Sequence, residues 1–285
     1  MSGERGPTVS IVVPCFNEEA NLRAGSLAHV LTYADRADDI REVLVVDDGS
    51  TDSSRQLVAE IGRRHAKLRL LTEPHRGKAG AVIAGIQAAA ADYVLFTDMD
   101  QATPIEEIER VRPYLVSGFD LVAGSRSGRR AGAPLIRKLM ATGFILIRRL
   151  ILDVGALTDT QCGFKCIRTT LAKRICENLR IYRPGIQQAA GATVTAAFDA
   201  ELLFVARRLG ARVVEVPVTW HYVGTRRVHP IRESWRGLRG LLEIRATAAR
   251  GDYDRPVAGS IDSARDVTVP ASSTGAKDEV PLITP

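Results

Sequence analysis

The sequence predicts an α/β fold in which a mostly parallel sheet is covered by helices on both faces. Short β-branched runs alternate with helical segments along the chain, as they do in βαβ units. The runs are apolar at successive positions, which is typical of parallel strands buried on both faces. Polar residues also gather where these runs end. With 285 residues, 45% of them hydrophobic and 25% charged, the chain can form one large α/β domain.

The first part of the chain contains five strand patterns separated by four helix patterns. Strands are expected at Val9–Pro14, Glu42–Asp47, Leu68–Leu71, Tyr93–Thr97 and Asp120–Ala123. Helices are expected at Glu18–Tyr33, from a Ser50 or Thr51 cap to His65, at Lys78–Ala90, and from Pro104 to Val116. Later segments are less regular: a strand at Cys162–Lys165, a helix at Phe198–Leu209, and a strand at Arg212–Val218 whose Pro217 suits a sheet edge.

These patterns give one domain over residues 8–250, preceded by a short arm at 1–7. Residues 251–285 are rich in Ser, Asp, Pro and Gly, which predicts a disordered tail. Residues 182–195 are rich in Gly, Gln, Ala and Thr without a clear period, and we expect a mobile insertion there. The four cysteines form no Cys-x-x-Cys pair, which favours buried reduced thiols over a disulfide or a zinc site.

The net charge of +6 is concentrated in two segments that are both basic and apolar. Arg126–Leu152 holds seven basic residues and no acidic one, and Arg226–Arg250 holds seven basic against two acidic residues. This combination favours an anionic membrane surface as a partner over nucleic acid, for which basic residues are usually interleaved with stacking aromatic ones. No apolar run reaches 18 residues and residues 1–7 are polar, so we expect a cytoplasmic protein, peripheral on the inner face of the membrane.

Two amphipathic helices are the candidates for this membrane interface. In the first, over 134–152, the basic residues fall on one side and the apolar residues on the other; the basic set is Arg137, Lys138, Arg148 and Arg149. In the second, over 231–248, Trp235, Leu238 and Leu242 form an apolar stripe beside arginines. Helices of this kind lie in a bilayer interface or pack in a domain core, and the sequence leaves both readings open.

The sharpest chemical signal is Thr97-Asp98-Met99-Asp100 at the end of a predicted strand. In an extended chain, residues i and i+2 point the same way, so Asp98 and Asp100 can share one Mg²⁺ or Mn²⁺ that would also bind a diphosphate. The alternative is an acidic turn with two solvated carboxylates, because Asp is common in turns.

Further polar residues follow neighbouring strands and should lie on the same edge of the sheet. Asp47 and Asp48 end the second strand, where carboxylates can accept hydrogen bonds from a base or a ribose. The first strand is closed beside them by Pro14, Asn17 and Glu18. Lys78 at a glycine-bordered helix start and Arg126 after the fifth strand are suited to phosphate oxygens. Taken alone, Lys78 also fits a solvated surface lysine.

In this order, these clusters resemble those of the family 2 glycosyltransferases with the Rossmann-like GT-A fold. Within that family the chain is most similar to the dolichyl-phosphate β-glucosyltransferase branch, and also to polyprenyl-phosphate mannose synthases. The resemblance rests on VVPCFNEE (12–19), VVDDGSTD (45–52), GKAGAVIAG (77–85), TDMDQATP (97–104), GSR (124–126), DTQCGFK (159–165), AFDAELLFVA (197–206) and VPVTW (216–220).

The resemblance implies roles for individual residues. The nucleotide-sugar site would comprise Pro14, Asn17, Glu18, Asp47, Asp48, Lys78 and Asp98, with Asp98 and Asp100 as the metal ligands. Arg126 would contact the diphosphate or the acceptor phosphate, and Asp159 would lie near the transferred sugar, so that the catalytic set is Asp98, Asp100, Arg126 and Asp159. The 182–195 insertion, and Thr195-Ala196 where relatives carry an aromatic residue, depart from the family pattern.

The resulting hypothesis is transfer of glucose from UDP-glucose to a polyprenyl phosphate, with inversion to a β-linked product. The same fold could instead use GDP-mannose. A sugar-1-phosphate nucleotidyltransferase would need a glycine-rich loop near its N-terminus, where VVPCFNEE stands here. A nucleotide-sugar-binding protein without turnover is the non-enzymatic alternative.

Overall fold

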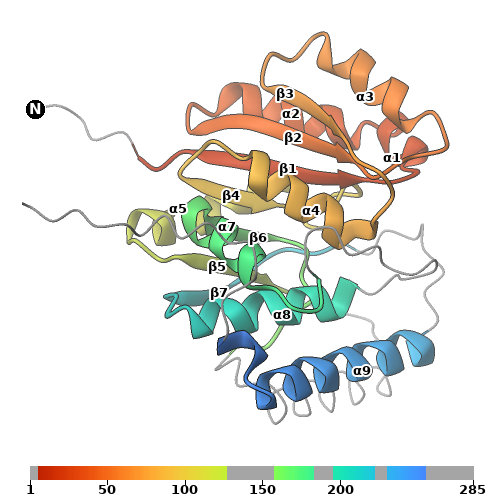
Figure 1. Ribbon diagram of the computed structural model, residues 1–285. Coiled ribbons are helices and arrows are strands. Elements are labelled where there is room, and N and C mark those ends of the chain that lie inside the picture. The colour runs from red at the N-terminus through yellow and green to blue at the C-terminus, as the bar shows by residue number, and fades with distance from the viewer. Residues whose placement is uncertain (1–5, 127–156, 183–194, 222–229, 255–285) are drawn as a thin grey trace, which may run out of the picture.

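The computed structural model describes residues 6–126, 157–182, 195–221 and 230–254, with backbone alone for 195–196 and 230–236. In these residues the strands form one sheet of order β3-β2-β1-β4-β6-β5-β7 (Figure 1). Its strands are β1 (Val9–Cys15), β2 (Ile40–Asp47), β3 (Leu68–Thr72), β4 (Tyr93–Phe96), β5 (Leu121–Ser125), β6 (Lys165–Arg168) and β7 (Val213–Pro217). All run in the same direction except β6, which is antiparallel to both β4 and β5.

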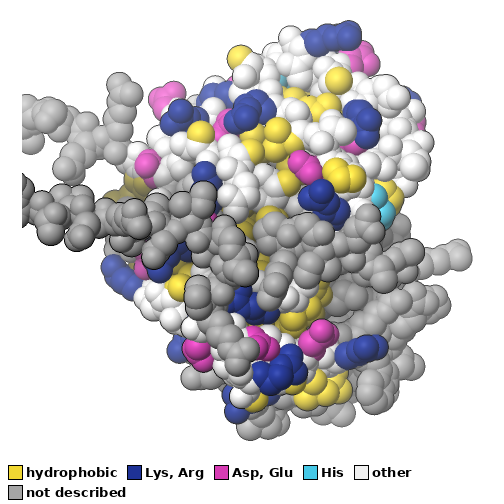
Figure 2. Space-filling view, viewed as in Figure 1, with side chains coloured by type: hydrophobic (Ala, Val, Ile, Leu, Met, Phe, Trp, Pro, Cys, Tyr) yellow, Lys and Arg dark blue, Asp and Glu magenta, His cyan; other side chains and the backbone are white. Residues whose placement is uncertain are grey.

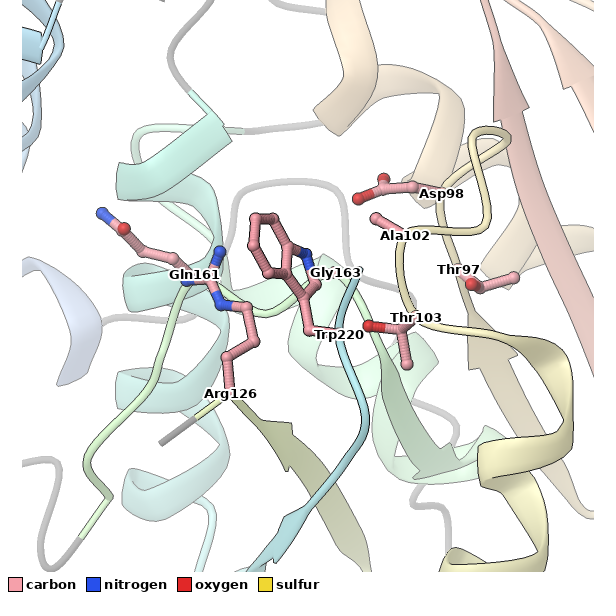
Figure 3. A pocket seen from close by; sticks show the side chains of 8 residues that line it. All are labelled: Thr97, Asp98, Ala102, Thr103, Arg126, Gln161, Gly163 and Trp220. Carbon is pink, nitrogen blue, oxygen red and sulfur yellow. The ribbon is translucent and has the colours of Figure 1, made fainter. Parts of the chain in front are cut away.

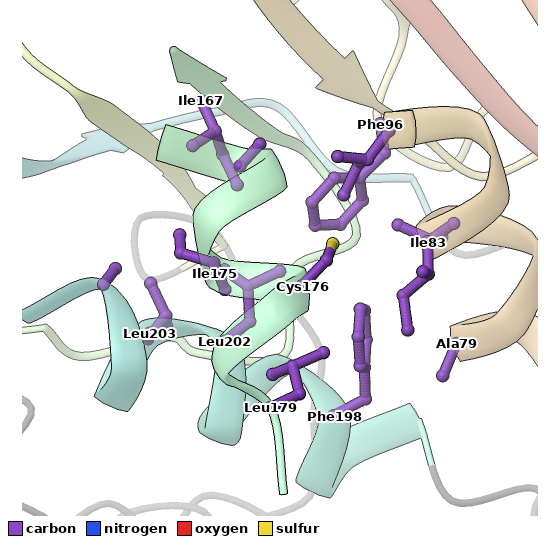
Figure 4. Packing of buried hydrophobic residues seen from close by; sticks show 14 of the residues in the cluster. Ala79, Ile83, Phe96, Ile167, Ile175, Cys176, Leu179, Phe198, Leu202 and Leu203 are labelled. Atoms are coloured by element: carbon purple, nitrogen blue, oxygen red, sulfur yellow. The ribbon is translucent and has the colours of Figure 1, made fainter. Parts of the chain in front are cut away.

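Helices cover both faces of this sheet, as predicted. One face carries α1 (Glu19–Arg23), α2 (Ser26–Arg36), α3 (Ser54–Gly62) and the η1–α5 segment (Ile105–Glu107, Ile108–Val116). The other carries α4 (Gly77–Ala88), α7 (Thr169–Asn178) and α8 (Thr195–Arg208). Alternate strand residues serve the two cores: Val12 faces α4, and Ile11 and Val13 face the opposite layer. Figure 4 shows Phe96 of β4 and Phe198 of α8 meeting Ile83 of α4 in the first of these cores.

The structure differs from the local predictions in several places. The helix expected over Glu18–Tyr33 is two helices, because Gly25 adopts a left-handed conformation with φ of 88° between them. The helix expected to start at Ser50 or Thr51 begins at Ser54 instead, since the Ser50 hydroxyl accepts the Asn17 N–H and caps nothing. Helix α7 was not anticipated, although its buried positions repeat with a helical period.

Residues 252–254 are ordered, where the start of a disordered tail was expected. Asp252–Asp254 forms a 3₁₀ turn, η2. The Tyr253 ring packs edge-on against Phe204 at 5.2 Å, and its hydroxyl donates to Glu201 at 2.8 Å. The predicted helix over 134–152, residues 183–194 of the insertion and residues 255–285 lie outside the described residues. The four cysteines are buried and unpaired, as predicted.

The helix expected over 231–248 is α9 (Pro230–Ala249), which lies along the outer side of α8 (Figure 1). It packs closely there, because a Cβ on Gly240 would come within 2.3 Å of the Ala197 Cβ. Leu241 and Ile244 are buried in this contact, whereas Leu242 of the predicted apolar stripe is 52% exposed. Basic and acidic side chains both appear over this part of the surface (Figure 2). No helix in the described ranges is long and apolar enough to cross a bilayer.

Candidate active site

A pocket opens at the edge of the sheet where the parallel strands end. Asp98 follows β4, Arg126 follows β5 and Trp220 follows β7. Because β6 is antiparallel, the residues that precede it reach this same edge, and Gln161 and Gly163 join the lining. Thr97, Ala102 and Thr103 complete it. In Figure 3, Arg126 and Gln161 lie on one side of the Trp220 ring and Asp98 on the other.

This pocket has a volume of about 40 Å³. A cavity needs about 10–15 Å³ to hold one water molecule, so the space suits a few water molecules or an ion but not a nucleotide. A nucleotide donor would therefore have to extend beyond this pocket.

Arg126 and Asp159 form a two-pronged ion pair on one wall of the site. The Arg126 Nε and Nη2 donate to the two carboxylate oxygens of Asp159 at 2.7 and 2.8 Å, and the Arg126 backbone N–H donates to the same group at 3.0 Å. Burial would raise the pKa of Asp159, but the Arg126 guanidinium outweighs it and holds that pKa at about 2. The pKa of Arg126 is raised in turn. Both groups are therefore charged at neutral pH.

A carboxylate from the neighbouring strand fixes the Asp159 loop. Glu215 of β7 accepts the backbone N–H groups of Thr158 and Asp159 at 2.7 and 2.8 Å, and the Thr158 hydroxyl at 2.8 Å. Asp159 in turn accepts the Gln161 N–H at 3.1 Å. The chain that carries Asp159 is thus held on both sides, and the arginine is aimed by a preorganised acceptor.

Asp98 and Asp100 lie in a turn, not in the extended chain on which their shared orientation was predicted. β4 ends at Phe96, and the Gln101 N–H closes the turn by donating to the Asp98 carbonyl at 3.2 Å. Asp100 accepts the Ala102 N–H at 3.1 Å. The extended chain assumed for these two residues is therefore not formed, and the joint binding of one ion by both carboxylates stays a prediction.

The surroundings of Asp98 fit a divalent cation. Its side chain is 39% exposed and borders the pocket, and its Oδ1 already contacts the ammonium group of Lys78, a positive charge in the position of a cation. No group of three His, Cys, Asp or Glu side chains that could hold a metal occurs among the described residues. Mg²⁺ is commonly bound by only one or two carboxylates and completed by substrate phosphates and water, so the carboxylates of Asp98 and Asp100 would be sufficient protein ligands.

Gly163 leaves the space that the Asp98 carboxylate occupies. A Cβ at this position would lie 2.4 Å from Oδ2 and 2.9 Å from Cγ of Asp98. A side chain at residue 163 would therefore displace the carboxylate, which explains why glycine stands between Cys162 and Phe164.

The acidic pair after β2 is buried and engaged within the protein. Asp47 binds the Arg55 guanidinium through Oδ2, at 2.9 Å from Nε and 2.8 Å from Nη2. Asp48 accepts the backbone N–H groups of Arg76 and Gly77 at 2.7 and 2.8 Å, which fixes the start of α4. Both side chains are at most 2% exposed. Their present contacts position the loop and the helix, and contact with a nucleotide stays a prediction.

The first loop is tied to the second by Asn17, which has a positive φ of 53°. Its Oδ1 accepts the Thr51 N–H at 2.8 Å, and its own N–H donates to Ser50 at 3.0 Å. Beside it the Phe16 ring stacks on His75 with centroids 4.1 Å apart. Phe16 is 37% exposed, so an aromatic face is available at this edge, a feature that the sequence reasoning missed.

A fully buried ion pair supports the floor of the site. The Lys165 Nζ donates to Asp199 Oδ1 of α8 at 2.7 Å and to the Cys162 carbonyl, and it lies 5.4 Å from the centre of the Phe96 ring. The Lys165 side chain is not exposed at all, and burial raises the pKa of Asp199 despite the lysine. Because Lys165 holds the carbonyl next to Gly163, the pair also constrains the backbone that borders Asp98.

Residues 10–175 match the model of glycosyl transferase family 2, which is more than half of the chain. The chain belongs to this family. The glycosyltransferase is 30% identical over 255 residues to a dolichyl-phosphate beta-glucosyltransferase of Dictyostelium discoideum, covering 83% of this chain and 73% of that one. Its identity to the Mus musculus protein of the same name is 30% over 264 residues, or 86% and 77% of the two chains. These similarities place the glycosyltransferase in the dolichyl-phosphate β-glucosyltransferase branch of family 2.

Solved structures confirm the GT-A fold. Glucosyl-3-phosphoglycerate synthase from Mycobacterium tuberculosis in complex with UDP superposes with a TM-score of 0.60 at 21% identity, over 85% of this chain and 81% of that one. The same enzyme with Mn²⁺, UDP-glucose and phosphoglyceric acid gives a TM-score of 0.60 at 20% identity, over 85% and 80%. At this level of identity the likeness concerns the fold alone.

The structure thus brings two of the predicted catalytic residues, Asp98 and Arg126, to one pocket, with Asp159 bound to the arginine. The predicted acceptor and membrane residues Arg137, Lys138, Arg148 and Arg149 lie outside the described residues. Sequence reasoning missed the individual roles of Gly163, Lys165 and Asp199, although all three stand in the DTQCGFK and AFDAELLFVA motifs. The role of Glu215 could not be predicted from the sequence, because acidic residues are common in edge strands and its hydrogen-bond partners lie far away in the chain.

Proposed function

We propose that this glycosyltransferase moves glucose from UDP-glucose to a polyprenyl phosphate, with inversion at the anomeric carbon to give a β-linked product. One observation carries the proposal beyond the family assignment: the carboxylate of Asp98 and the guanidinium of Arg126 border the same pocket. A site that joins a diphosphate-bound sugar to a phosphate nucleophile needs a cation for the leaving group and a second cation for the nucleophile. The similarity to dolichyl-phosphate beta-glucosyltransferases supports the choice of sugar and acceptor.

Asp98 and Asp100 would hold Mg²⁺ or Mn²⁺. When bound, such an ion neutralises the charge that develops on the departing UDP. The protein's own part is to present the Asp98 carboxylate between Lys78 and Gly163, and to offer the Lys78 ammonium group to phosphate oxygens.

Arg126 would orient the acceptor phosphate. Its pair with Asp159 engages two of the five N–H donors of a guanidinium, and the rest can face a phosphate from a fixed position. A phosphate monoester is already ionised near neutral pH, so the attack requires alignment more than a strong base. Asp159 would act by positioning Arg126 and by lying close to the transferred sugar.

The sugar donor can be tested by offering UDP-glucose and GDP-mannose together with polyprenyl phosphate and determining the mass of the lipid product. A hexosyl lipid whose isotope label comes from UDP-glucose alone is the expected result. Label from GDP-mannose alone would remove the glucose assignment and favour the mannosyl alternative. No product from either donor, with nucleotide binding intact, would favour a binding protein without turnover.

The metal can be tested with the double variant Asp98→Asn, Asp100→Asn, which should lose Mn²⁺-dependent transfer while keeping its fold. Asp38→Asn is the matched control, because Asp38 is exposed and lies just before the start of β2, whereas the candidate site lies at the edge where the parallel strands end. Circular dichroism checks the fold. Full activity in the double variant would remove the proposed metal site.

We further propose that the protein docks on the cytoplasmic face of a membrane through the basic, apolar segments 134–152 and 231–248. Leu242 supports this for α9, because it is exposed while Leu241 and Ile244 pack inward. Replacing Arg137, Lys138, Arg148 and Arg149 by Glu should release the protein from anionic vesicles in a flotation assay, and so should Leu242→Ser in part. Unchanged binding of both variants would rule out these two segments as the membrane-docking surface.

A further inference from the structure

Lys78 and Asp98 were each predicted to bind a component of the donor, but in the structure they bind one another. Lys78 is the second residue of α4, and its Nζ forms an ion pair with Asp98 Oδ1 in the turn after β4. The two side chains are only 26% and 39% exposed. They are 20 positions apart in the sequence, so the pair is a product of the fold and not of local sequence.

Contacts of the neighbouring backbone fix the positions of both Lys78 and Asp98. On the lysine side, Asp48 binds the backbone N–H groups of Arg76 and Gly77, so Lys78 extends from a fixed helix start. On the other side, Gly163 lies against Asp98 Oδ2, and Lys165 holds the chain next to that glycine through the Cys162 carbonyl. The carboxylate therefore sits between an ammonium group and a backbone wall.

A divalent cation has to compete with the Lys78 ammonium group for the Asp98 carboxylate. The ammonium group already neutralises the carboxylate, and it would repel a second positive charge held a few ångströms away. A metal ion that binds Asp98 must therefore displace Lys78 or share the carboxylate with it at a loss of affinity. A diphosphate offers the displaced ammonium a new anionic partner.

We propose that Lys78 is an internal counterion for Asp98: it occupies the cation position until the donor arrives, and it then moves from the carboxylate to the diphosphate. The inference rests on the proposed function, because it assumes a metal-bound nucleotide donor. Its consequence is a positive coupling between metal and nucleotide. Metal alone has to displace Lys78 from Asp98, whereas metal with UDP offers the displaced lysine the anionic diphosphate. Each ligand should therefore raise the affinity of the other by the same factor.

The coupling can be measured without turnover by titrating the protein with MnCl₂ and following free Mn²⁺ by electron paramagnetic resonance, with and without UDP. Lys78→Met should bind Mn²⁺ alone about fivefold more tightly than the wild type. This factor corresponds to about 1 kcal/mol, the upper end of the interaction energies found for solvent-exposed ion pairs. UDP should then raise the Mn²⁺ affinity of this variant less than it does in the wild type. Lys78→Arg keeps the charge and should behave like the wild type.

Arg76→Gln is the matched control for a general loss of positive charge. Arg76 lies two residues before Lys78, and its side chain pairs with Glu73 at 3.8 Å, not with Asp98. Its affinity for Mn²⁺ alone should equal that of the wild type. Unchanged or weaker Mn²⁺ binding by Lys78→Met would overturn the proposal, and so would an equal gain in Arg76→Gln.

The failure of this inference can be told from failure of the proposed function. If the wild type binds Mn²⁺ with UDP and transfers glucose but Lys78→Met shows no gain, only the counterion role is lost. If the wild type binds no Mn²⁺ even with UDP, the metal in the proposed function and the counterion role are both wrong.

Discussion

Substitution of Gly163 by alanine would move the Asp98 carboxylate without removing its charge. The new Cβ would lie 2.4 Å from Asp98 Oδ2, whereas ordinary van der Waals contact begins at 3.4 Å, so the carboxylate has to retreat by about 1 Å. A displacement of about 1 Å in a catalytic group can lower the rate by about 10²-fold. We therefore expect kcat/KM for glucose transfer to fall by about two orders of magnitude.

The fold should tolerate the same change. Gly163 does not adopt a left-handed φ, so an alanine backbone is unstrained there. Asp98 is 39% exposed and can rotate toward solvent, which keeps the expected change in the free energy of unfolding within about 1 kcal/mol. Loss of activity with normal stability is the signature of a misplaced carboxylate.

The assay measures transfer of labelled glucose from UDP-glucose to polyprenyl phosphate over a range of Mn²⁺ concentrations, with urea unfolding measured in parallel. Gly6→Ala is the matched control, because a Cβ at Gly6 meets no atom within 4 Å. Activity of Gly163→Ala within about threefold of the wild type, at the same Mn²⁺ requirement, would refute the reasoning, because 10²-fold is the loss expected for a 1 Å shift.

Two further predictions concern the buried charges around the site. Replacing Asp159 by Asn should lower the free energy of unfolding at pH 7 by about 2 kcal/mol, since Arg126 depresses the Asp159 pKa from 3.8 to about 2. A depressed pKa stabilises the fold above about pH 4, and this stabilisation is lost as the pH falls toward 2. The difference in free energy of unfolding between wild type and variant, measured with urea, should therefore shrink between about pH 4 and pH 2. A difference that does not change with pH would show that the ionised Asp159 carboxylate is not its source. Lys165→Met should destabilise the protein by about 3–5 kcal/mol because it leaves Asp199 buried without a counterion. The double variant with Asp199→Leu should be more stable than the single one in the same assay, and strictly additive losses would show that the pair is not coupled.

Much of the architecture follows from local sequence pattern. The apolar runs of β1, β2 and β4 and the turns that end them are visible in the residues alone, because a strand buried on both faces needs apolar side chains at successive positions. The acidic residues 47, 48 and 98 could be assigned to one edge for a related reason: parallel strands end together. Fold class, family and the position of the candidate site could therefore be predicted from the sequence.

Other features required non-local contacts. The orientation of β6 decides that Asp159 and Gly163 join the site, and an antiparallel strand between two parallel ones leaves no mark in its own residues. The turn at residues 98–101 is closed by a backbone hydrogen bond from Gln101 to Asp98, and an acidic turn was the alternative to the extended chain assumed for Asp98 and Asp100.

The sequence by itself determined which side chains are available at the sheet edge and what chemistry they favour. Only the tertiary structure decided their partners: Arg126 with Asp159, Lys78 with Asp98, and Lys165 with Asp199. The physical reason is that hydrophobic periodicity is a property of neighbouring residues, whereas an ion pair between residues 20 to 34 positions apart depends on how strands and helices pack.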